Sequence, residues 1–229
     1  MRSCKWLLGL LAGLLLWAPR DAGAETIGFE CPNLGALDRL MLDPYVDCVY
    51  GVTFTAEPSG FGDEVVGLVR DHATSACIEP PSDNQLLGTG RDDEGPIGLS
   101  GFPIRATFPV AISTSAIALA FQTLEGSTVR VRVYDDAGVE IASGSEVAEP
   151  GAGDCGLGGG PRALKTIFVP VDPSLCTSYV IMDVDGPAVF VIESFTWVPS
   201  VKALAAGAGG CGATPNRKAT WGRLKTLYR

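Results

Sequence analysis

TVRVRVY, the stretch Thr128–Tyr134, alternates three valines with two arginines. In a strand this alternation places the valines on one face and the arginines on the other. The stretch therefore predicts a half-buried antiparallel strand. Asp135-Asp136-Ala137-Gly138 follows it, and Gly138 suits the positive φ of a tight turn. The chain returns through Val139–Ala142, so the sequence predicts a β-hairpin here.

Short apolar or alternating segments recur on both sides of this hairpin, separated by turn-rich stretches such as Gly88–Gly101 and Glu149–Pro161. Only Leu34–Leu42 is expected to be helical in the body of the chain. The pattern predicts an all-β fold, an antiparallel two-sheet β-sandwich. The other expected strands are Thr26–Glu30, Val49–Ala56, Val65–Arg70, Ile104–Phe108, Ala116–Phe121, Leu164–Val169, Ser178–Asp183 and Val189–Val198.

The first residues have the pattern of a secretory signal peptide. Met1–Ala24 begins with Arg2 and Lys5, continues with an apolar run and ends in Ala22-Gly23-Ala24, a typical cleavage site. The apolar run is about twelve residues, fewer than the roughly twenty that a spanning helix needs. We therefore expect export, to the extracellular space, the cell surface or the periplasm, with no transmembrane segment after cleavage.

The mature chain is expected to have three parts. Residues 25–200 form the sandwich, 201–218 form an Ala/Gly-rich linker, and 219–229 form a basic tail. Trp221, Leu224 and Tyr228 give the tail a small apolar stripe at helical spacing. A helix this short needs a partner to be ordered in water. The tail is either a short amphipathic helix for sorting or docking, or a frayed terminus.

Signal cleavage leaves six cysteines, whose spacing is unlike that of zinc or redox motifs. An even number in an exported domain favours disulfides. Six cysteines allow 15 pairings. Two pairs flank segments that could fold back on themselves, Cys31 with Cys48 and Cys155 with Cys176, and these pairs are preferred. The alternative for any one of them is a small buried thiol. The six are Cys31, Cys48, Cys77, Cys155, Cys176 and Cys211.

The charges are distributed unevenly. Residues 25–200 hold 25 acidic and 8 basic side chains, whereas 201–229 hold 6 basic and no acidic ones. An acidic body argues against nucleic acid as a partner, because phosphates require Lys and Arg. It is compatible with divalent cations, or with solubility alone.

Four pieces together resemble the secreted bacterial β-sandwiches of the galactose-binding-like, jelly-roll superfamily. They are Ile27-Gly28-Phe29-Glu30, Tyr50-Gly51-Val52-Thr53-Phe54, the hairpin Val133–Gly138 and the closing strand Phe190–Trp197. The resemblance implies an antiparallel jelly roll whose members include carbohydrate-binding modules and surface proteins. A glycan or another cell-surface component is the partner that it implies.

In many such modules a structural calcium ion is held by carboxylates of the first and last strands, and Glu30 and Glu193 match those places. Strict alternation also puts Glu193 on the core face with Trp197, where a lone carboxylate is costly. Two alternatives remain open for Glu193. A β-bulge could turn it outward, or it could pair with an arginine such as Arg105.

Sugar binding usually needs exposed aromatic rings. The pattern places Trp197 in the core, which leaves Tyr45 and Phe61, in expected loops, as the candidate ligand-binding aromatics.

No catalytic signature is specific. His72 is the only histidine, and Asp71 and Ser75 lie near it without a defined geometry. We expect a non-catalytic interaction or surface-structural module, with or without calcium as a structural ion. The alternatives are a carbohydrate-binding module and a hydrolase that uses acidic loop residues. Such a hydrolase would draw on Asp92-Asp93-Glu94, Asp63-Glu64 or Asp183 with Asp185.

Deletion of Ala213–Arg229 is expected to leave the thermal midpoint of the body unchanged and to alter where the exported protein resides. The Ala/Gly linker and the reversal of charge separate the tail from the sandwich. Thermal unfolding and fractionation of the two forms check this. A large drop in the midpoint would show that the tail packs into the domain.

Overall fold

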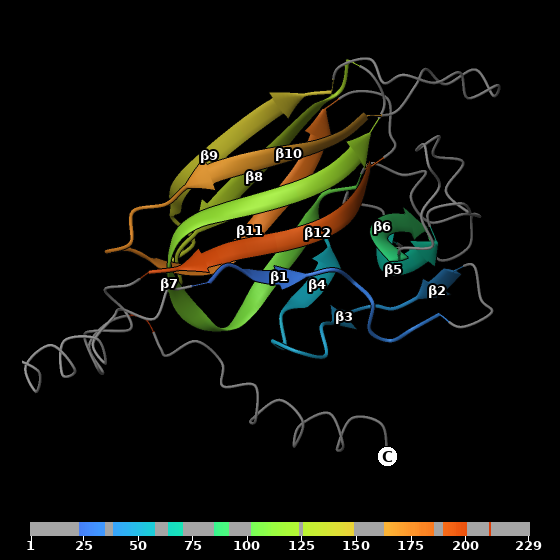
Figure 1. Cartoon of the computed structure of the whole chain (residues 1–229), viewed down its shortest axis with the longest axis horizontal. Coiled ribbons are helices and arrows are strands. Elements are labelled where there is room, and N and C mark those ends of the chain that lie inside the picture. The colour runs from blue at the N-terminus through green and yellow to red at the C-terminus, as the bar shows by residue number, and fades with distance from the viewer. Residues whose placement is uncertain are drawn as a thin grey trace, which may run out of the picture.

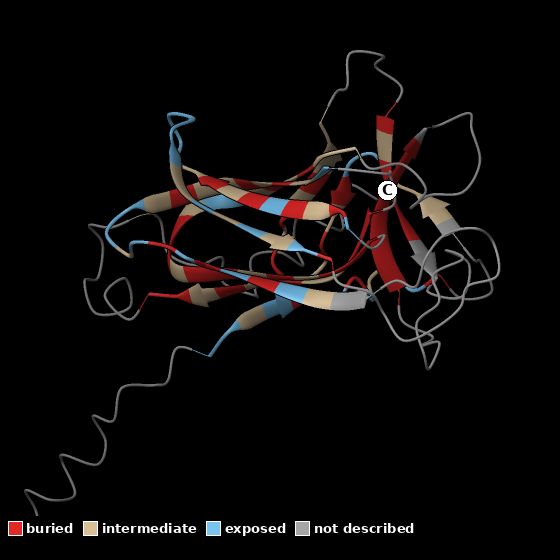
Figure 2. Cartoon of the chain, turned by 90° about the horizontal axis from the view of Figure 1, so that it is seen from above, coloured by how far each residue is buried: buried red, intermediate tan, exposed pale blue. Residues whose placement is uncertain are grey.

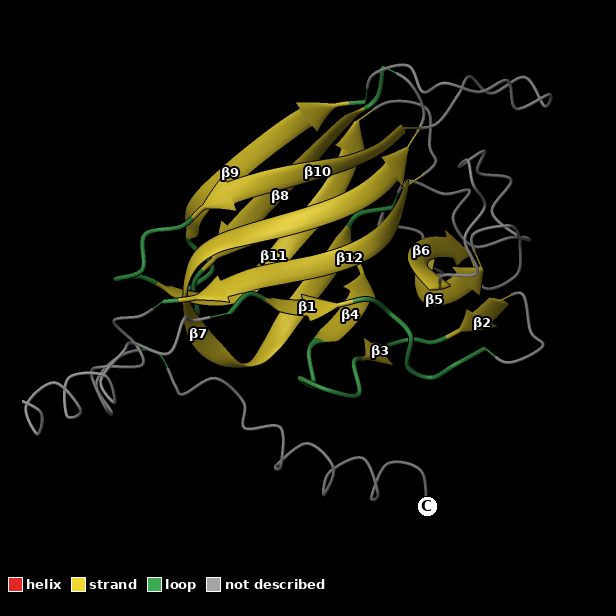
Figure 3. Ribbon diagram, in the orientation of Figure 1, coloured by secondary structure: helices red, strands yellow, loops and turns green. Residues whose placement is uncertain are grey.

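The computed structural model describes residues 23–34, 39–57, 64–70, 85–91, 102–123, 126–148, 163–185, 190–200 and 211. Within these ranges the regular structure consists of β-strands (Figure 3). The strands are β1 Glu25–Ile27, β2 Arg39–Met41, β3 Tyr45–Val46, β4 Thr53–Ala56, β5 Glu64–Arg70, β6 Gln85–Arg91, β7 Ile104–Thr123, β8 Thr128–Tyr134, β9 Glu140–Val147, β10 Ala163–Pro170, β11 Cys176–Asp185 and β12 Phe190–Pro199.

The strands form two antiparallel layers, which confirms the predicted sandwich (Figure 1). Sheet A runs β2-β5-β6-β12-β7-β10, with β1 also paired to β12. Sheet B runs β4-β7-β11-β8-β9, with β3 paired to β4. The first and last strands therefore lie side by side, as the jelly-roll resemblance implied.

Strand β7 belongs to both layers. Residues 104–113 pair with β4 and β11 in sheet B, and residues 114–123 pair with β10 and β12 in sheet A. At the corner the Thr114 hydroxyl lies within hydrogen-bond distance of the carbonyls of Ala116 (2.8 Å) and Val198 (2.7 Å), and its single O–H is shared between them. The hydroxyl therefore links β7 to β12 where β7 changes partners.

The core lies between the layers and is rich in aromatic side chains. Trp197 contacts Tyr50 edge-on at 4.8 Å between ring centroids and Phe108 at 5.4 Å. Phe54 meets Phe195 at 5.8 Å in the same geometry. Along outer strands such as β8, buried positions alternate with more exposed ones, whereas β6 is buried at each position from 85 to 90 (Figure 2). Tilted and edge-to-face pairs of this kind stabilise beyond the area that they bury.

Two disulfides tie chain segments to the sandwich. Cys31–Cys48 confirms the first preferred pair. Cys176 bonds to Cys211 rather than to Cys155, so the second preference is wrong. The start of β11 pairs with Ser113 at the corner of β7, and Ser200, just after β12, donates to the Ser113 carbonyl at 3.1 Å. Ser200 therefore lies close to Cys176. Cys77 and Cys155 lie outside the described residues.

Three expectations about single elements are wrong. The predicted helix Leu34–Leu42 contains strand β2, because residues 39–41 pair with β5. The stretch Gly88–Gly101 begins inside β6, which pairs with β5 over all seven residues. The expected strands Ile104–Phe108 and Ala116–Phe121 are parts of one strand, β7. Pro109 lies within β7, in a stretch that pairs with no described strand, so the missing N–H of the proline costs little there.

The edge strands β9 and β10 meet across the open side of the sandwich. Lys165 of β10, whose side chain is 17% exposed, pairs with Glu146 of β9 at 3.4 Å. Charged side chains that point inward at an edge discourage pairing with another chain. Gly144 of β9 faces β10, and a Cβ there would lie 2.9 Å from Val169 Cγ2. The absence of a side chain at Gly144 thus allows β9 and β10 to approach each other.

In the described part of the chain no helix is long and apolar enough to cross a membrane. The expected signal peptide and the tail 219–229 lie outside that part.

Asp47 holds the turn between β3 and β4. It is 4% exposed, and its Oδ2 accepts from the backbone N–H groups of Tyr50 (2.6 Å) and Val49 (3.0 Å). Burial raises the pKa of Asp47, and the backbone hydrogen bonds oppose this only in part. The folded state thus binds a proton here more tightly than the unfolded state does.

Stability should consequently fall as pH rises from the ordinary aspartate pKa through the raised one. Asp47→Asn keeps a side-chain oxygen acceptor and removes the buried charge, so at pH 7 it should be as stable as the parent or more stable. Its stability should also depend less on pH. Asp47→Ala leaves two N–H groups without their acceptor and should cost about 1–3 kcal/mol. Urea unfolding between pH 4 and 8 measures all three proteins. Equal destabilisation by both variants at pH 7 would contradict this account.

Candidate functional site

The outer face of sheet B carries a row of ionic pairs. In β8 the three valines at 129, 131 and 133 are fully buried, so Arg130 and Arg132 point outward as predicted. Arg130 reaches Asp185 of β11 at 2.9 Å, and Arg132 pairs with Asp183. Each arginine thus meets a carboxylate on the neighbouring strand. The face presents hydrogen-bond donors and acceptors in alternation.

Beside the ionic pairs stand three stacked planar groups. Tyr134 of β8 lies directly opposite Tyr179 of β11, and their rings stack at 4.8 Å with an interplanar angle of 9°. The Arg105 guanidinium of β7 covers the other face of Tyr179, 3.7 Å from the ring centroid. Arg105 also pairs with Glu57 at 3.4 Å. The result is a rigid polar and aromatic platform across three strands.

Arg132 links the platform to the ionic pairs. Its Nη1 donates to the Tyr134 hydroxyl at 3.2 Å, while its Nη2 donates to Asp183. Burial lowers the pKa of Arg132, but attraction to Asp183 and the hydrogen bond with it, together with Tyr134 and Glu140, raise that pKa above its ordinary value. The guanidinium is therefore a permanent cation, and it fixes the orientation of Tyr134.

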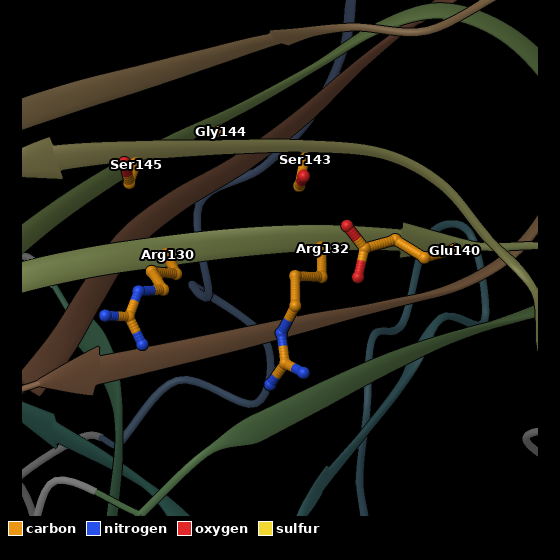
Figure 4. A pocket seen from close by; sticks show the side chains of 6 residues that line it. All are labelled: Arg130, Arg132, Glu140, Ser143, Gly144 and Ser145. Carbon is orange, nitrogen blue, oxygen red and sulfur yellow. The ribbon is translucent and has the colours of Figure 1, made fainter.

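A hollow of about 270 Å³ opens next to this row, between β8 and β9 (Figure 4). Ser143 and Ser145 of β9 lie opposite Arg132 and Arg130 in the strand register. Because the serines are short and the arginines long, a depression remains along β9. Its lining residues are Arg130, Arg132, Glu140, Ser143, Gly144 and Ser145.

The two carboxylates predicted to hold calcium lie at the β1–β12 side. Glu30 is exposed in the segment after β1, and Glu193 is half-buried in β12. β12 has a bulge at Glu193, since Ile192 and Ser194 face consecutive residues of β7. Strict alternation therefore does not hold, and Ile192 rather than Val191 shares the main core with Phe195. The bulge was one of the alternatives for Glu193.

Among the described residues no group of three or more Asp, Glu, His or Cys side chains could hold a metal ion. Backbone carbonyls are also calcium ligands, so calcium binding by Glu30 and Glu193 stays a prediction.

The aromatic candidates from the sequence are not the ones on the platform. Tyr45 lies in β3, is 1% exposed and donates its hydroxyl to the Cys31 carbonyl at 2.7 Å. It is a core residue, so its assignment to sugar binding is wrong. Trp197 is buried as predicted. Phe61 lies outside the described residues, as do His72 and its neighbours.

Three of the acidic residues considered for hydrolysis lie in the described part of the chain. Asp183 and Asp185 are the partners of two arginines. Glu64 is buried in β5. Asp63 and Asp92-Asp93-Glu94 lie outside the described residues. Sequence reasoning missed Tyr134 and Tyr179, although the alternation of β8 already put Tyr134 on the outward face with the arginines.

Neither a protein-family model nor a curated protein matches the chain. Among solved structures, the K2 cleaved adhesin domain of Lys-gingipain is 8% identical, with a TM-score of 0.45, and the match covers 78% of this chain and 99% of that one. The K1 adhesin domain, from Porphyromonas gingivalis W83, is 13% identical with a TM-score of 0.40 and the same coverage.

A low-affinity xylan binding module from Roseburia intestinalis is 10% identical, with a TM-score of 0.32, and the match covers 82% of this chain and 99% of that one. The similarity to these domains is one of fold.

Calcium should raise the thermal midpoint of the oxidised protein relative to a chelator, because a ligand specific for the folded state stabilises it. Glu193→Gln should abolish the rise, and Glu140→Gln, which removes an exposed carboxylate elsewhere, should leave it intact. Thermal unfolding with and without calcium tests this. Coincident curves for the parent protein would exclude a calcium site.

Proposed function

We propose that this chain is a secreted, non-catalytic module that binds a glycan on the outer face of sheet B. The observation that carries the proposal is the stacked row Arg105–Tyr179–Tyr134 beside two Arg–Asp pairs. In the described part of the chain, it is the one face that combines aromatic stacking with charged hydrogen-bonding groups.

The chemistry of a sugar matches this face. A pyranose ring offers C–H groups that pack on an aromatic surface and hydroxyls that both donate and accept hydrogen bonds. The guanidinium groups of Arg130 and Arg132 only donate, whereas the carboxylates of Asp183 and Asp185 only accept. Tyr134 ends the stacked row on the side of β9, where the hollow opens. A few well-placed polar groups beside an aromatic surface are typical of small-molecule sites.

The ionic pairs favour binding over hydrolysis. A glycosidase needs one carboxyl group that gives up a proton and a second that acts as base or nucleophile. Both Asp183 and Asp185 are held in ion pairs with arginines of β8. Carboxylates fixed in this way accept hydrogen bonds, which suits recognition of hydroxyl groups.

Export fits the same function. Disulfides persist in oxidising compartments, and Cys31–Cys48 and Cys176–Cys211 are both formed. Together with the expected signal peptide, they support a location outside the cytoplasm, where a glycan ligand is accessible.

Tyr134→Ala should weaken glycan binding about tenfold, since it removes an aromatic contact and the hydroxyl that orients Arg132. Tyr134→Phe should lose less, because the ring remains. Isothermal titration with the oligosaccharides that a glycan array selects measures these affinities.

Phe168→Ala is the matched control. Phe168 lies on β10 of sheet A, and at 63% exposure it is an aromatic side chain open to solvent on the opposite layer. Its removal should leave the affinity unchanged. Loss of binding in Phe168→Ala but not in Tyr134→Ala would move the site to sheet A, and an array without any bound glycan would refute the proposed function.

A further inference from the structure

The hollow between β8 and β9 differs in chemistry from one end to the other. At one end Arg130 stands opposite Ser145, and both side chains carry hydrogen-bond donors. At the other end Glu140 lies opposite Tyr134 and supplies a carboxylate beside Arg132. Figure 4 shows Arg130 and Ser145 together at one side, and Ser143, Arg132 and Glu140 at the other. The hollow thus has a cationic end and a mixed end.

The two arginines are not equally available. Arg132 is held by Asp183, whose side chain is only 16% exposed, and by the Tyr134 hydroxyl. Arg130 and its partner Asp185 are far more open, at 50% and 66%. An ion pair this exposed is worth roughly 0–1 kcal/mol. A ligand anion can therefore take the place of Asp185 at little cost, and Arg130 is the cation of the hollow that can exchange partners.

The size of the hollow limits what can enter. The hollow is an open depression of about 270 Å³ rather than an enclosed cavity. A single sugar unit can lie in it. The open side toward solvent allows that unit to be part of a longer polymer.

We propose that the hollow binds a sugar unit that carries an acidic group, a carboxylate or a sulfate, and this inference rests on the proposed glycan-binding function. The acidic group lies between Arg130 and Ser145, and the hydroxyls point toward Ser143 and Glu140. Guanidinium groups recognise carboxylates and similar anions through two parallel hydrogen bonds, which are stronger than bonds between neutral groups.

The acidic body of the protein does not prevent this. Charges more than about 8 Å apart are largely screened at physiological ionic strength. The contact with Arg130 is direct, whereas most of the acidic residues act from farther away. Arg130 attracts the acidic group at short range, while the acidic body weakly repels the ligand at long range. We therefore expect slow association and an affinity that depends on salt concentration.

The test compares each acidic sugar with its neutral counterpart. Trisaccharides of galacturonate, glucuronate and mannuronate are titrated beside their methyl esters, which keep the ring and lose the charge. A 6-sulfated galactose trisaccharide beside the unsulfated one distinguishes sulfate from carboxylate. At least one acidic sugar should bind about tenfold more tightly than its neutral counterpart, the ratio of one charge-assisted contact.

Two variants of one ion pair should act in opposite directions. Arg130→Gln should abolish the preference for the acid, because it should lower the affinity for the acidic sugar about tenfold more than the affinity for the neutral one. Asp185→Asn should raise the affinity for the acid several-fold, because it removes the competing carboxylate. Both positions are exposed, and unchanged thermal midpoints would show that both variants are folded.

Equal binding of acids and neutral counterparts, or an equal loss of both in Arg130→Gln, would overturn the inference and leave the glycan-binding function standing. A lower affinity of Asp185→Asn for the acidic sugar would also overturn the inference. It would show that Asp185 holds Arg130 in place rather than competing with the ligand. Absence of binding to every sugar tested, and to a glycan array, would refute the proposed function together with the inference.

Discussion

The whole structure depends on one strand that two sheets share. β7 forms a central strand of sheet B with its first half and of sheet A with its second half. At the bend the Thr114 hydroxyl shares its proton between the Ala116 and Val198 carbonyls and so links β7 to β12. The strand that carries Arg105 to the outer face of sheet B also carries Leu119 into the core against Phe195. The position of the proposed binding face is thus fixed by the same element that closes the sandwich.

On the outer face of sheet B, each arginine of β8 has a carboxylate of β11 as its partner. Arg130 and Arg132 project from a strand whose other face is fully buried, and they would repel each other without the carboxylates of β11. The pairs contribute little to stability where they are exposed. Their value lies in orientation, because they hold donors and acceptors upright on a rigid sheet. Stacking of Tyr134 on Tyr179 fixes the neighbouring aromatic surface in the same way.

Local sequence patterns predicted well which segments form strands and which of their side chains are buried. They predicted poorly which residues contact one another across the fold. The alternation of β8 was enough to place its valines inside and its arginines outside, since the two-residue period is a property of the chain itself. The register of β11 against β8 was not predictable, because it depends on contacts between residues more than forty positions apart, and so the Tyr134–Tyr179 stack was missed. The bulge at Glu193 and the pairing of Cys176 with Cys211 are likewise tertiary effects. Tyr45 was misplaced because its burial depends on packing against Phe29 and Phe54.

The central claim is that ligand recognition belongs to the outer face of sheet B. The most direct measurement is a backbone amide NMR titration of the oxidised protein with a uronate trisaccharide. The account predicts shifts confined to β8, β9 and the adjoining end of β11, with the largest near Arg130, Tyr134 and Ser145. Shifts centred on β10 and β12 of sheet A, or on the segment after β1, would contradict it.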